Sequence, residues 1–91
     1  MPGFDRLLKE LREDNWCKKL YVSPDNKMCL KCALTMGNFP RAMDEAIRRA
    51  ISERGVAMSI EGFNDLPDTT WLDIVAIVQR AKEIYPTLFR D

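Results

Sequence analysis

Hydrophobic residues recur every three or four positions in several parts of the chain, which is the spacing of one face of an α-helix. Segment 3–14 shows this pattern clearly and predicts an amphipathic helix of about three turns. The same spacing predicts a short helix over 29–36, followed by Gly37, and a longer one over 40–55 that ends at Gly55. A final helix is predicted over about 71–85, with Pro86 closing it.

Segment 15–22 has a different period, because its apolar and polar residues alternate and aromatic and β-branched side chains are frequent, as in a β-strand. Residues 23–27 are rich in turn formers, so the chain is predicted to return through Met28 as the second strand of a short hairpin. Alternation indicates an extended stretch over 56–61, and composition a loop over 62–70 that ends in a Thr-x-x-Asp helix start signal. The predicted fold is mainly α (α+β): a small helical domain with one short β-hairpin, all 91 residues forming a single domain.

The apolar faces of these elements are expected to meet in one core. The predicted core residues are Leu7, Leu8, Leu11, Trp16, Leu20, Cys29, Ala33, Met43, Ile47, Ile51, Leu72, Val75 and Val78.

Basic residues are concentrated in one region, although the whole chain has 14 basic and 14 acidic residues and no net charge. Segment 15–43 contains Arg41 and, in or beside the predicted hairpin, four lysines, against a single aspartate. The four lysines are Lys18, Lys19, Lys27 and Lys31. Such a surface suits an acidic partner or nucleic acid phosphates. The alternative, that the lysines only keep the hairpin solvated, is favoured by the absence of a recognisable nucleic-acid-binding motif.

Residues suited to catalysis or metal binding are few. The chain has no histidine, which removes the usual general base and the commonest metal ligand. Cys29 and Cys32 have C-x-x-C spacing, but with Cys17 they supply three ligands where a closed zinc site takes four. A redox pair would need a βαβ pattern, which is not found. We therefore expect buried, reduced cysteines, no metal or other cofactor, and no enzymatic activity.

The pattern also bears on localisation. No apolar run approaches the roughly 18 residues of a membrane span, and the first residues lack the apolar core of a signal peptide. We expect a cytoplasmic protein that does not associate with membranes.

Asn64 and Asp65 form the most specific polar stretch. They are typical of a turn ahead of a helix, which we favour; the alternative is a small polar binding site beside Trp16 or Phe63. The final helix is a second candidate, because it is apolar nearly all round in its first two turns. Ile77 and Ile84 are expected to form an exposed apolar patch for a second copy of the chain or for another protein. The alternative is that neighbouring helices cover both residues.

Three motifs carry a family resemblance. They are Asn-Trp at 15–16, Cys-Leu-Lys-Cys-Ala-Leu at 29–34 and Phe-Asn-Asp-Leu-Pro-Asp-Thr-Thr at 63–70. The chain resembles, over about 4–84, a family of small uncharacterised proteins of actinobacteria and their phages, with Gly-Trp, C-x-x-G-A-L and W-N-D-x-P-x-R-T motifs. It departs from that pattern at Cys32, Phe63 and Thr69, where the family has glycine, tryptophan and arginine. The resemblance implies a phage or actinobacterial origin and no particular activity.

Two functional hypotheses follow. The first is a small non-enzymatic binding module that docks on a host protein, or on itself, in the cytoplasm. The second is a nucleic-acid or nucleotide binder that uses the four lysines of the basic hairpin. The candidate binding residues are Trp16, Lys18, Lys19, Asn64, Asp65, Ile77 and Ile84.

Overall fold

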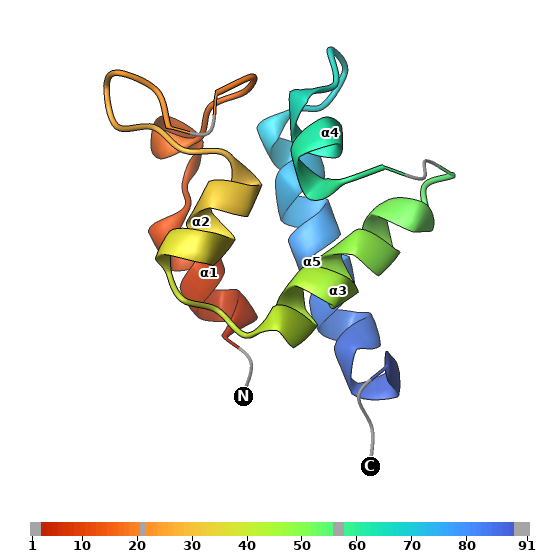
Figure 1. Ribbon diagram of the computed structural model, residues 1–91. Helices are drawn as coiled ribbons and strands as arrows, with labels where there is room; N and C mark the ends of the chain where they lie inside the picture. Colours follow the sequence, from red (N-terminus) through yellow and green to blue (C-terminus); the bar gives the residue numbers. More distant parts are fainter. Residues whose placement is uncertain (1–2, 21, 56–57, 89–91) are drawn as a thin grey trace.

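The computed structural model describes residues 3–20, 22–55 and 58–88 (Figure 1). The elements in this part of the chain are α1 (Phe4–Glu10), the 3-10 turn η1 (Glu13–Asn15), α2 (Leu30–Met36), α3 (Arg41–Ser52), α4 (Ile60–Asp65) and α5 (Trp71–Leu88). Helix α5 runs the length of the molecule and makes its largest contact with α3, while α1 and α2 lie together beside this pair (Figure 1). The prediction of a mainly helical fold is confirmed.

The β-hairpin predicted over 15–28 is wrong. Within the described part of this segment, Met28 makes only isolated bridges, a parallel one with Trp16 and an antiparallel one with Val22. Lys19 has a positive φ of 69°, which breaks the extended backbone that a strand requires. The described residues of segment 16–29 therefore form an irregular connection, which we call the long loop.

The turn predicted within the long loop is present. The Ser23 amide donates to the Lys27 carbonyl at 2.7 Å, and the Lys27 amide donates back to the Ser23 hydroxyl at 3.0 Å. Tyr21, in the predicted first strand, and residues 56–57, in the predicted extended stretch, lie outside the described residues.

Helix α4 forms over the last two residues of the predicted extended stretch and the first four of the predicted loop, so both predictions are wrong there. The Ser59 hydroxyl accepts a 3.0 Å hydrogen bond from the Gly62 amide and caps the helix. Its buried residues, Ile60, Phe63 and Asn64, have helical spacing. The helix is short and rich in polar residues, so its helical periodicity is not evident in the sequence.

One hydrophobic cluster contains residues of all five described α-helices. Of the predicted core, Leu7, Leu11, Cys29, Ala33, Met43, Ile47, Ile51 and Val78 are buried, Leu8, Trp16 and Val75 are partly buried, and Leu20 and Leu72 are exposed.

Helix α5 buries a different face from the predicted one. Leu72, predicted to be buried, is 76% exposed, whereas Ile77 and Ile84 are 1% and 8% exposed. The first two turns of α5 are almost wholly apolar, so they do not define a face. In the second half, charged residues separate Ala81 from Ile84, so these two define the apolar face. Ile77 lies one turn before Ala81 and is therefore on the same face. Pro86 does not end α5 but lies in its last turn.

The predicted start signal of α5 is confirmed. The Thr70 amide donates to the Asp73 carboxylate at 2.8 Å, and the Asp73 amide donates to the Thr70 hydroxyl at 3.4 Å. The Arg54 guanidinium lies 3.1 Å from the same carboxylate. The hydrogen bond from the Thr70 backbone, followed by the one from Arg54, lowers the pKa of Asp73 below its ordinary value.

Asp73→Ala is expected to lower the free energy of unfolding at neutral pH by about 0.5–2 kcal/mol, the usual effect of losing a helix cap. Because folding lowers the pKa of Asp73, the carboxylate stabilises fully above about pH 4, where an unfolded aspartate is ionised. This contribution is lost as the pH falls through the lower, folded-state pKa. Urea denaturation of the wild type and the variant from about pH 7 to pH 2.5 should show that their difference in unfolding free energy becomes smaller in acid. A difference that stays constant would contradict the role of the ionised Asp73 carboxylate as a helix cap.

Candidate functional site

Five of the predicted site residues meet where the long loop contacts α4. They are Trp16, Lys18, Lys19, Asn64 and Asp65, and we call this cluster the Asn64 junction. It brings together residues nearly fifty positions apart in the sequence.

The Asn64 side chain is fully buried and uses all of its hydrogen-bonding groups. Its oxygen accepts from the Trp16 indole N–H at 2.6 Å and from the Leu30 amide at 3.1 Å. Its nitrogen donates to the Cys17 carbonyl and to the Asp65 carboxylate, both at 3.0 Å. Asn64 therefore joins the long loop, the start of α2 and the end of α4.

The Lys18 ammonium and the Asp65 carboxylate of the junction are also engaged within the protein. The Lys18 ammonium donates to the carbonyls of Leu66 and Thr69, the latter at 2.7 Å. The Asp65 carboxylate accepts the Lys19 amide at 2.6 Å and so supports the positive φ of that residue. The turn predicted at Asn64 and Asp65 is thus a short helix end whose side chains hold the long loop in place.

Asn64→Ala is expected to lower the free energy of unfolding by about 3 kcal/mol or more, because it leaves several buried groups without partners. Trp16→Phe removes only the indole donor and should cost about 1 kcal/mol. Urea denaturation measures both. A stable Asn64→Ala protein would contradict this structural role and return Asn64 to the list of ligand-binding candidates.

The exposed patch predicted at Ile77 and Ile84 is wrong. Both residues belong to the hydrophobic core, where the other helices cover them. The alternative raised from the sequence is the correct one: neighbouring helices cover both isoleucines.

Ile77→Glu should therefore lower the free energy of unfolding by about 3 kcal/mol or more, because it buries a carboxylate without a partner. Leu72→Glu, on the same helix but exposed, is the matched control and should change it by less than about 1 kcal/mol. Thermal melts compare them. Equal melting temperatures would show that Ile77 is at the surface.

The cysteines have a structural environment. Cys29 caps α2, since its sulfur accepts a 3.3 Å hydrogen bond from the Cys32 amide, and both residues are buried. Burial, and then the neighbouring Cys29 thiol, raises the pKa of Cys17 and of Cys32. Thiols with raised pKa values are protonated at neutral pH and are poor nucleophiles. Within the described residues, no three Cys, Asp or Glu side chains are placed to hold a metal ion.

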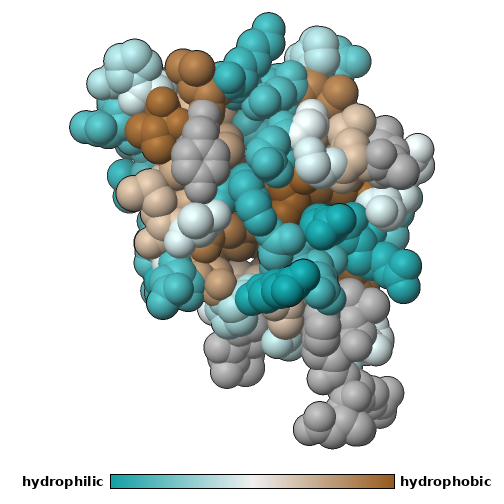
Figure 2. Space-filling model, viewed as in Figure 1, coloured by the Kyte–Doolittle hydropathy of each residue, from teal (hydrophilic) through white to brown (hydrophobic). Residues whose placement is uncertain are grey.

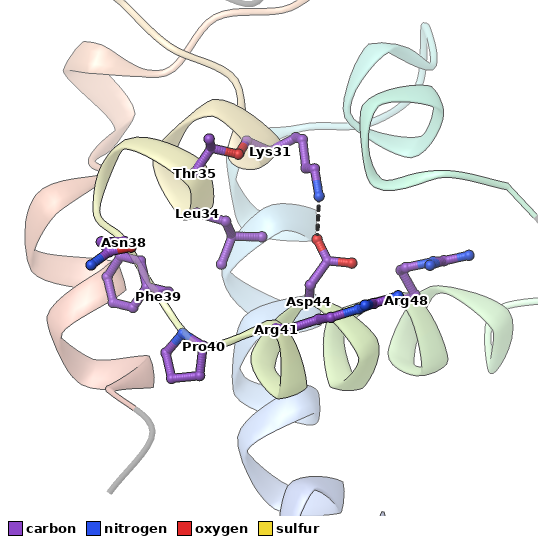
Figure 3. Close-up of a pocket in the computed structure, with 9 residues that line it drawn as sticks. All are labelled: Lys31, Leu34, Thr35, Asn38, Phe39, Pro40, Arg41, Asp44 and Arg48. Carbon is purple, nitrogen blue, oxygen red and sulfur yellow. Dashed lines mark hydrogen bonds and ion pairs between the residues drawn. The ribbon is translucent and has the colours of Figure 1, made fainter.

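A pocket of about 480 Å³ opens between α2 and α3 (Figure 3). We call it the basic pocket. It is lined by Lys31, Leu34 and Thr35 of α2, by Asn38, Phe39 and Pro40 of the connection, and by Arg41, Asp44 and Arg48 of α3.

The charged residues of the basic pocket come from both helices. Arg41, Asp44 and Arg48 are three and four positions apart, which places them along one face of α3 (Figure 3). The sequence suggests an ion pair between Asp44 and Arg48, but Asp44 instead lies 2.5 Å from the Lys31 ammonium of α2. With Asp44 taken by Lys31, neither Arg41 nor Arg48 has an acidic partner in the part of the chain that the structure describes.

The electrostatic character of the basic pocket is positive. Three basic side chains and one carboxylate line it, and Figure 2 shows strongly hydrophilic side chains gathered over α3 on this face. Helix α3 begins at this pocket without a side-chain cap, because its capping residue is Pro40. Arg41 then places a cation in the first turn, where the helix dipole disfavours one. The arrangement suits an anionic group brought by a ligand.

The wall of the pocket depends on a close contact in the connection. A β-carbon at position 37 would lie 2.3 Å from the Phe39 ring. Glycine at this position therefore leaves room for the ring. The Arg6 guanidinium covers the same ring at 3.9 Å from its centroid, and Arg6 also donates to the Gly37 carbonyl. Phe39 is thereby held between α1 and the pocket.

Comparison with family models finds a match to a family of unknown function (DUF6197) over residues 4–84. The chain belongs to this family. The match has the extent predicted from the resemblance and contains both the Asn64 junction and the basic pocket. A search of curated proteins and a search of solved structures each found no match.

For the DUF6197 chain, the basic pocket is the candidate site that sequence reasoning missed. Lys31 and Arg41 lie in the basic segment 15–43, but Arg48 lies outside it and has no sequence signal of its own. Among the described residues, no helix is both long enough and apolar enough to cross a lipid bilayer.

Proposed function

We propose that this protein is a small non-enzymatic binding module that docks on another protein through the basic pocket. The observation that carries the proposal is a pair of guanidinium groups, Arg41 and Arg48, that lie at a pocket between two helices without an acidic partner among the described residues. Arginine is the side chain best suited to bidentate contacts with carboxylates of a partner.

The alternative function, nucleic-acid or nucleotide binding by the four lysines, has less support. Lys18 donates to backbone carbonyls, Lys27 lies 3.8 Å from the Asp25 carboxylate, and Lys31 pairs with Asp44. Only Lys19 of the four remains without such a partner among the described residues. Phosphate binding draws its affinity from several free cations acting together, so this distribution favours a protein partner.

The partner is more readily a different protein than a second copy. A symmetric contact would place two identical positive pockets against each other, and like charges oppose such a contact. The resemblance to proteins of actinobacteria and their phages points to a host protein in the cytoplasm. The non-enzymatic character is supported by the raised pKa values of Cys17 and Cys32.

The double variant Arg41→Glu/Arg48→Glu is expected to abolish capture of the partner while the fold remains, because both side chains are exposed. Lys9→Glu/Arg49→Glu is the matched control. It makes the same change in charge at two exposed residues that form no salt bridge among the described residues and do not line the basic pocket. Immobilised wild-type and variant proteins are exposed to actinobacterial extract with and without nuclease treatment, and bound proteins are quantified by mass spectrometry.

The expected result is a protein retained by the wild type and the control but lost from Arg41→Glu/Arg48→Glu. The same set of proteins on all three would contradict docking through the basic pocket. Capture that disappears after nuclease treatment would favour the nucleic-acid alternative.

A further inference from the structure

A second concavity adjoins the basic pocket. Its volume is about 850 Å³, and it lies between the start of α1 and the end of α5. It is lined by Gly3, Phe4, Asp5, Pro40, Lys82, Tyr85 and Pro86, and we call it the apolar hollow. Pro40 lines both cavities, so the two open next to each other at the start of α3.

The apolar hollow differs in chemistry from its neighbour. Its two charged residues pair with each other, the Lys82 ammonium lying 2.9 Å from the Asp5 carboxylate. The other walls are largely ring carbons, and the Phe4 and Tyr85 rings pack edge to face with centroids 5.7 Å apart. A positive pocket, whose two arginines have no acidic partner among the described residues, thus lies beside an apolar hollow whose charges pair with each other.

We propose that the partner presents an extended peptide segment with two neighbouring acidic residues and, a short distance away, one large apolar side chain. This inference rests on the proposed docking function and specifies its ligand. Two carboxylates balance the basic pocket, where three cations face one anion, and the apolar side chain fills the hollow across Pro40. An extended chain advances about 3.3 Å per residue, so a few residues span from one cavity to the next.

Fluorescein-labelled synthetic peptides test the inference. Each carries a Glu-Glu pair and a Phe separated by two, four or six Gly/Ser residues, in either order, and the controls carry only the Glu-Glu pair or only the Phe. Fluorescence polarisation should show that the best two-part peptide binds at least about tenfold more tightly than the Glu-Glu control, the gain expected from burying a large apolar side chain.

Two variants separate the contributions of the cavities. Arg41→Glu/Arg48→Glu should weaken the two-part peptide and the Glu-Glu control alike. Pro86→Glu places a carboxylate at the apolar hollow and should remove only the gain from Phe. Gln79→Glu, exposed on α5 and outside the lining of the hollow, is the matched control and should bind as the wild type does.

The outcomes distinguish this inference from the proposed function. If no two-part peptide binds more tightly than the Glu-Glu control, or if Pro86→Glu keeps the gain, the two-part ligand is wrong while docking through the basic pocket stands. If no peptide binds at about 1 mM, which corresponds to a binding free energy near −4 kcal/mol, the inference is overturned. The capture experiment then tests the docking function independently. Displacement of a bound peptide by a short single-stranded oligonucleotide would assign the pocket to nucleic acid and overturn both.

Discussion

The buried amide of Asn64 is the interaction on which the other parts of this fold depend. A buried polar group without a partner costs free energy, so four groups from different segments must lie around this side chain together. One of them is the amide of Leu30, the first residue of α2. Asn64 thereby fixes where α2 begins, and this sets the register of that helix against α3.

The basic pocket is a consequence of that register. Lys31 is the next residue after Leu30, and its ammonium reaches Asp44 across the gap between α2 and α3. Within α3 alone, Asp44 would be available to Arg48 one turn later. The interhelical pair therefore leaves Arg48 without an acidic partner, and Arg41 one turn earlier has none among the described residues. An ion pair that joins two helices thus also leaves the pocket with a net positive charge.

The parts of the fold that follow from local spacing were predictable from the sequence. Helix α3 has a regular apolar face, and the Thr70–Asp73 start signal of α5 needs only residues three positions apart. The failures have non-local causes. The alternating segment of the long loop becomes no strand, because Lys19 takes a positive φ that an aspartate 46 residues away supports. The basic pocket was missed for the same reason, since the preference of Asp44 for Lys31 over Arg48 depends on how two helices pack.

The buried face of α5 was predicted wrongly because the prediction used the first two turns of the helix. Its first two turns are apolar on nearly every side, and there the exposed Leu72 and the buried Ile77 look alike in sequence. Only the second half, where charged residues separate Ala81 from Ile84, defines which side meets α3. The charged residues follow a similar rule. Lys18 and Arg41 are equally basic in the sequence, but the fold supplies carbonyl partners to Lys18 and, within the part of the chain that the structure describes, none to Arg41. Charge that the fold leaves unmatched at a concave surface, rather than charge as such, is what remains for a ligand to neutralise.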